Sequence, residues 1–73
     1  MPDIPSKLAE AIVRTIAWCD VLEISPTVTE VWCWLMQWQG KPPSLVEVAT
    51  AIAQDPWLAE RIERHGAYVT LKG

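Results

Sequence analysis

The 73-residue sequence has no phenylalanine, one histidine and only two cysteines, and these scarcities exclude several kinds of site. Cys19 and Cys33 allow at most one disulfide, and they lack the Cys/His spacing of a zinc site. Both fall within predicted helices, where a thiol is ordinarily buried or lies at an interface. We therefore expect a reduced, cytoplasmic protein with no bound metal.

Long apolar runs and catalytic motifs are also missing. No segment approaches the roughly 18 uncharged apolar residues of a membrane span, and no N-terminal stretch is typical of a targeting signal. There is no glycine-rich phosphate loop and no pair of carboxylates at a spacing that suggests catalysis. His65 lacks an evident nucleophile or orienting group, so we expect it to be an exposed turn residue. These absences predict a soluble protein that is not an enzyme and binds no cofactor.

Apolar residues, by contrast, are abundant. They make up 51% of the sequence and include five tryptophans. A domain of this length leaves much of its surface in contact with water, so one small core does not hide so many apolar side chains. We expect some of them to meet a partner.

Capping residues and apolar spacing predict three helices, at about 6–19, 28–39 and 44–55. Ser6 is a suitable N-cap, and Thr27/Glu30 and Ser44/Glu47 both have the spacing of a capping box. Asp55-Pro56 ends the third helix, and residues 57–60 form either another helical turn or a tight loop. The residues expected to face inward are Leu8, Ile12, Thr15, Ile16 and Cys19 in the first helix, Val28, Val31, Leu35 and Trp38 in the second, and Leu45, Val48, Ala49 and Ile52 in the third.

The last part of the sequence, at about 61–71, predicts a β-hairpin. A short polar turn with glycine in its second place suits His65-Gly66, and this turn pairs Ile62 with Val69. Ile62, Val69 and Leu71 then share one face. Because an isolated hairpin is marginal in water, this face should pack on the first and third helices.

Three short helices followed by a hairpin predict a single mainly α (α+β) domain over 1–73, with the order of a winged helix-turn-helix. The stretches IAWCDVLEISPTVTEVWCWL, PSLVEVATAIA and RIERHGAYVTLKG support this prediction. They resemble the winged-helix segment at the N-terminus of some bacterial nucleotidyltransferase-like proteins.

The resemblance implies an architecture and not an activity. It places Asp20, Thr27, Glu30, Ser44, Glu47, Gly66 and Tyr68 in structural positions, as caps, turn or core residues. The metal-binding carboxylates of a nucleotidyltransferase would lie in a separate domain, which these 73 residues do not include.

The tryptophans favour protein interaction as the function. Trp32 and Trp34 flank the inward face of the second helix, with Met36 beyond Trp32, and Trp18 lies on a flank of the first. Aromatic residues and methionine are enriched where proteins meet. We expect these four residues to form an interface with a second copy of the chain or with a cognate protein.

Nucleic-acid binding through the hairpin is the alternative. Residues 61–73 carry a net charge of +2, and Arg61, Arg64, His65 and Lys72 are the candidate phosphate contacts. However, residues 1–60 carry −5, and the outward face of the third helix presents Glu47, Thr50 and Gln54 without a basic residue. Since phosphate contacts supply most of the affinity for DNA, protein interaction is the preferred prediction.

Overall fold

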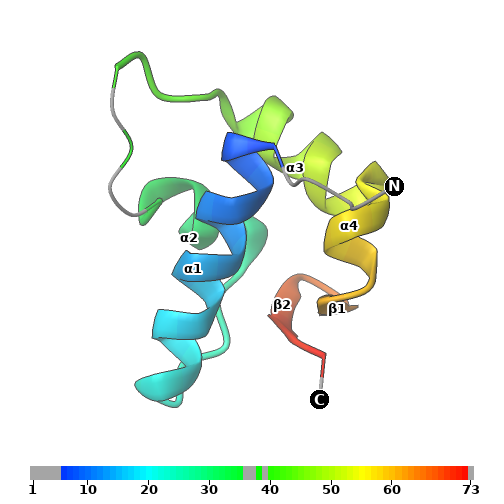
Figure 1. Ribbon diagram of the computed structural model, residues 1–73. Coiled ribbons are helices and arrows are strands. Elements are labelled where there is room, and N and C mark those ends of the chain that lie inside the picture. The colour runs from blue at the N-terminus through cyan, green and yellow to red at the C-terminus, as the bar shows by residue number, and fades with distance from the viewer. Residues whose placement is uncertain (1–5, 36–37, 39, 73) are drawn as a thin grey trace.

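The computed structural model describes residues 6–35, 38 and 40–72 of the chain (Figure 1). Over these residues the chain is mostly helical and ends in a two-stranded antiparallel hairpin, which confirms the predicted α+β class. The elements are α1 (Lys7–Val21), α2 (Val28–Cys33), α3 (Leu45–Gln54), α4 (Pro56–Ala59), β1 (Ile62–His65) and β2 (Tyr68–Leu71).

The predicted N-caps begin the first three helices. The hydroxyls of Ser6 and Ser44 each accept the backbone N–H of the third residue that follows, at 3.0 and 3.1 Å. At α2 the capping box is complete: Thr27 Oγ1 accepts from the Glu30 N–H at 3.2 Å, and Glu30 Oε1 accepts from the Thr27 N–H at 2.9 Å. These bonds satisfy backbone donors that a helix start leaves without partners.

The second helix is shorter than the predicted 28–39, because it ends at Cys33 with Trp34 as its C-cap. Tertiary contacts fix Trp32 and Trp34 at this end of the helix. The Trp34 carbonyl accepts the Thr15 hydroxyl of α1 at 3.4 Å, and the Trp32 indole N–H is donated to the Pro43 carbonyl at 2.9 Å. Residues 36, 37 and 39 of the predicted helix lie outside the described residues.

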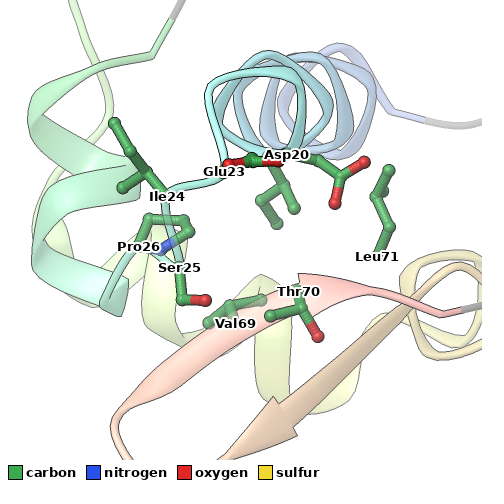
Figure 2. A pocket seen from close by; sticks show the side chains of 9 residues that line it. Asp20, Glu23, Ile24, Ser25, Pro26, Val69, Thr70 and Leu71 are labelled. Atoms are coloured by element: carbon green, nitrogen blue, oxygen red, sulfur yellow. The ribbon is translucent and has the colours of Figure 1, made fainter.

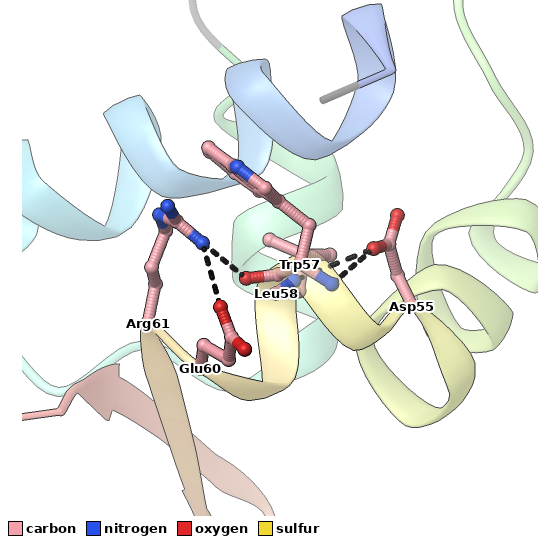
Figure 3. A network of polar contacts seen from close by, with 5 residues as sticks. All are labelled: Asp55, Trp57, Leu58, Glu60 and Arg61. Carbon is pink, nitrogen blue, oxygen red and sulfur yellow. Dashed lines mark hydrogen bonds and ion pairs between the residues drawn. The ribbon is translucent and has the colours of Figure 1, made fainter. Parts of the chain in front are cut away.

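Residues 56–59 form the further turn of helix that was one of the two predicted outcomes. Asp55 is both the C-cap of α3 and the N-cap of α4, and its Oδ1 accepts from the N–H groups of Trp57 at 2.9 Å and Leu58 at 3.4 Å (Figure 3). Pro56 occupies the first turn, where a helix needs no donor from it. Leu58 is fully buried, so this turn is part of the core.

The hairpin turn is Gly66-Ala67, one residue later than the predicted His65-Gly66. His65 pairs with Tyr68, and Ile62 pairs with Leu71 in place of the predicted Val69. Gly66 has φ +64° and Ala67 does not have a positive φ, which is the pattern of a type II′ turn with glycine in first place. The partner of each β1 residue moves by two positions, so Ile62, Val69 and Leu71 still share the face predicted for them.

The core lies between α1 and the other elements. β2 packs on α1, while β1 packs on α4, which takes the place predicted for the third helix. The Val69 N–H is donated to the Pro26 carbonyl at 2.8 Å, and Thr27 forms an isolated bridge with Tyr68. Leu45 was predicted to be buried but is exposed, because it is the first residue of α3 and stands at the edge of this core. The buried cluster contains Ala9, Ile12, Ile16, Val31, Val48, Ile52, Leu58, Ile62 and Val69.

Candidate functional site

Large apolar side chains are exposed around the C-terminal ends of α1 and α2. Val21 is 78% exposed, Trp18 and Leu22 are each 47% exposed, and Ile24 and Trp34 are exposed to about the same extent. We call these five residues the apolar end surface. Together they expose on the order of 500 Å², which is as large as the biggest apolar patch of an ordinary monomer.

Helical spacing on α1 and one hydrogen bond to α2 relate these residues to one another. Trp18 and Leu22 lie one turn apart on α1, and Trp18 follows Thr15 on the same flank. Because the Thr15 hydroxyl reaches the Trp34 carbonyl, the end of α2 is fixed beside this flank. The apolar end surface thus combines residues from both helices.

The chain leaves α1 through a Schellman turn, which places Ile24 at the edge of the surface. The Ile24 N–H is donated to the Cys19 carbonyl at 2.8 Å, and the Glu23 N–H is donated to the Asp20 carbonyl at 3.0 Å. The turn requires a left-handed residue, a position at which glycine is usual. Here that residue is Glu23, with φ +58°.

A pocket of about 150 Å³ lies between this turn and β2 (Figure 2). Figure 2 shows the Asp20 carboxylate between the end of α1 and Leu71. This volume is below the ~300 Å³ at which small-molecule sites begin, so the pocket suits one side chain better than a cofactor or substrate. Its lining consists of Ile16, Asp20, Glu23, Ile24, Ser25, Pro26, Val69, Thr70 and Leu71.

The segment that carries the five residues of the apolar end surface is negatively charged. Between Arg14 and Lys41 the sequence contains Asp20, Glu23 and Glu30 and no basic residue. Arg14 is itself paired with Glu10 at 2.6 Å. The last turn of α1 has no basic residue either, so the partial negative charge of the helix end adds to that of the carboxylates.

The structure places the predicted interface residues in different environments. Trp18 and Trp34 are exposed, whereas Trp32 is partly buried against the core and fixed by its bond to Pro43. Met36 lies outside the described residues. The sequence reasoning missed Val21, Leu22 and Ile24, because it ended the first helix at Cys19. The spacing of Leu22 four residues after Trp18 was the signal that could have identified them.

The basic residues of the hairpin are only partly available to a ligand. The Arg61 guanidinium lies over the Trp57 ring at 4.1 Å, donates to the Trp57 carbonyl at 2.9 Å and lies 3.6 Å from Glu60 (Figure 3). His65 lies 3.3 Å from Glu63. Arg64 and Lys72 are exposed, and neither forms an ion pair with another described residue.

The two cysteines are free and differ in exposure. Cys19 is fully buried, and its burial raises the pKa of the thiol, with a further increase from the negative charge of Glu30. Cys33 was expected to be buried or at an interface and is exposed. Across residues 6–35, 38 and 40–72, no three histidine, cysteine, aspartate or glutamate side chains gather as a metal site would require.

Comparisons of the chain with protein-family models, with curated proteins and with solved structures gave no match. None of the helices in the described part of the chain has the length and apolar character needed to cross a membrane.

Proposed function

We propose that the chain is a non-catalytic winged-helix module that binds protein through the apolar end surface. The observation that carries this proposal is the exposure of Trp18, Val21, Leu22, Ile24 and Trp34 on and beside the C-terminal half of α1. Burying such side chains against a partner removes a large apolar area from water with little loss of side-chain freedom.

The arrangement of elements supports the winged-helix part of the proposal. The helices α1, α2 and α3 and the short α4 precede the hairpin, and the hairpin is fixed to the segment before α2 by the Val69–Pro26 bond and the Thr27–Tyr68 bridge. In this arrangement α3 occupies the position of a recognition helix, and the hairpin is the wing. Winged helices serve both as DNA readers and as protein-docking modules, so the fold leaves the choice to the surface chemistry.

Nucleic-acid binding through the hairpin is the weaker candidate. Arg61 is occupied by Trp57 and Glu60, and His65 faces Glu63, which leaves Arg64 and Lys72 as its basic contacts. A duplex bound through these two residues would weaken steeply with salt and be released by Arg64→Ala/Lys72→Ala. Measured fluorescence anisotropy of a labelled duplex at low salt would reveal such binding.

The test of protein docking is site-specific photo-crosslinking in cells that produce the protein. A photoreactive amino acid replaces Val21, which is 78% exposed, and a matched variant carries it at Ala53, an exposed residue of α3. We expect a discrete protein adduct from position 21, including a dimer of the chain if it self-associates, and none from position 53.

A second substitution makes this experiment specific for the surface. Adding Trp34→Ser to the Val21 crosslinker variant should abolish the adduct, because the tryptophan contributes to the same surface. Equal adducts from positions 21 and 53, or an adduct that survives Trp34→Ser, would refute docking at this surface.

A further inference from the structure

The apolar end surface is bordered by carboxylates that have no partner within the described chain. Asp20 and Glu23 form no ion pair and accept no side-chain hydrogen bond among the residues described. Both flank Val21 and Leu22 in the sequence and line the pocket beside β2. These two carboxylates therefore lie beside Ile24, at the edge of the apolar end surface that faces β2, whereas Trp18 and Leu22 lie on the other side of α1.

The same residues argue against a second copy of the chain as the occupant. A symmetric dimer through the apolar end surface would bring together two copies of the same negatively charged segment, which contains Asp20, Glu23 and Glu30. The ends of both α1 helices would add their partial negative charges. Like charges across an interface disfavour such a pairing.

A partner with both apolar and basic side chains could contact the apolar residues and the carboxylates together, because Ile24 belongs to the apolar end surface and also lines the pocket. Its apolar side chains would cover Trp18, Val21, Leu22, Ile24 and Trp34, which lack a cover in the isolated chain. A lysine or arginine beside them would enter the pocket, pair with Asp20 or Glu23 and lay its aliphatic stem along Leu71. The pocket volume of about 150 Å³ suits a single side chain of this kind.

On the basis of the proposed function, we propose that the natural occupant of the apolar end surface is a polypeptide segment that combines apolar side chains with lysine or arginine. The apolar side chains supply the buried area, and the basic residues select the partner and its orientation. Glu23 and Asp20 are then the specificity-determining residues of the surface.

The experiment starts from a library of random dodecapeptides displayed on phage, selected on the intact 73-residue chain. We expect the enriched peptides to share apolar residues next to lysine or arginine. A synthetic copy of the most enriched peptide is then titrated by fluorescence anisotropy. Its affinity should fall about tenfold in Asp20→Asn/Glu23→Gln and should weaken as the salt concentration rises.

Two control variants separate the possible outcomes. Glu47→Gln/Glu63→Gln removes the same charge elsewhere and should leave the affinity unchanged. Val21→Ser tests the apolar end surface itself, and loss of binding in Val21→Ser together with normal binding in Asp20→Asn/Glu23→Gln would overturn the basic partner while leaving protein docking intact. Normal binding in both variants would count against docking at this surface as well.

The composition of the selected peptides and the oligomeric state of the chain test the basic partner further. Enrichment of acidic or uncharged peptides, or no enrichment, would overturn the proposal. Light scattering provides the last arm: a dimer of the purified chain that Val21→Ser dissociates would identify a second copy as the occupant, and the basic partner would be refuted.

Discussion

Replacing Glu23 by glycine should stabilise the domain while weakening its proposed interaction. Glu23 is the left-handed residue of the Schellman turn that ends α1, with φ +58°. A side chain at this φ places its Cβ close to the following carbonyl, which costs about 1.5 kcal/mol. Glycine has no Cβ, so the turn can keep its two backbone hydrogen bonds without this cost.

The net effect is smaller than the strain, because glycine also increases the freedom of the unfolded chain by about 0.7 kcal/mol. Removing a negative charge beside the end of α1 returns about 0.3 kcal/mol. The free energy of unfolding should therefore rise by about 1 kcal/mol. In a domain of this size that corresponds to a Tm about 4–8 °C higher.

Urea unfolding followed by tryptophan fluorescence measures the change, with calorimetry for the Tm. Glu23→Gln is the matched control: it removes the same charge but keeps the left-handed side chain, so it should gain only about 0.3 kcal/mol. If Glu23→Gly proves no more stable than Glu23→Gln, the turn carries no strain and the reasoning is wrong. A stabilised Glu23→Gly that also binds basic peptides less well would show that the glutamate is retained for binding.

Three further predictions concern other parts of the structure. Leu58→Ala, which empties a fully buried site in α4, should lower the free energy of unfolding by about 2–5 kcal/mol, measured by urea titration with the exposed Ala59→Ser as a neutral control. Thr27→Ala should lower it by about 1 kcal/mol through loss of the capping box, and an unchanged urea midpoint would contradict that role. Cys33 should react at once with a thiol reagent, whereas Cys19 should react only when the protein unfolds. Burial raises the pKa of Cys19 above the ordinary 9.0, so above that pH the thiol ionises first in the unfolded chain and the free energy of unfolding should fall. Equal labelling rates for the two thiols would refute the burial of Cys19.

The sequence carried enough information to locate the helix starts and the hairpin. Ser6, Thr27 and Ser44 satisfy backbone donors close to them in the chain, and such local chemistry is visible in a sequence. The end of α2 depends instead on Thr15 and Pro43, which lie far from Trp34 and Trp32 in the sequence. No local pattern reports those contacts, so the predicted helix was too long.

In the hairpin and the candidate site, too, local features were predictable from the sequence and features set by distant or unusual contacts were not. The alternation of apolar residues predicted the faces of Ile62 and Val69 correctly, but it is compatible with registers two residues apart, and the turn decides between them. Val21 and Leu22 fell beyond the predicted end of the first helix, and Glu23 gave no sign of a left-handed turn, for which glycine is the usual signal. The apolar end surface could therefore be recognised only once that turn was seen.

The attachment of β2 to the segment before α2 has a consequence for how the chain is made. The Val69 N–H is hydrogen-bonded to the Pro26 carbonyl, and β2 packs on α1. The last strand of the chain therefore completes the core that the first helix begins. While only the helices have emerged from the ribosome, the apolar side of α1 is exposed to the cell. The domain can close over that side only after Leu71 has emerged, so the nascent protein passes through a stage at which it depends on protection from aggregation.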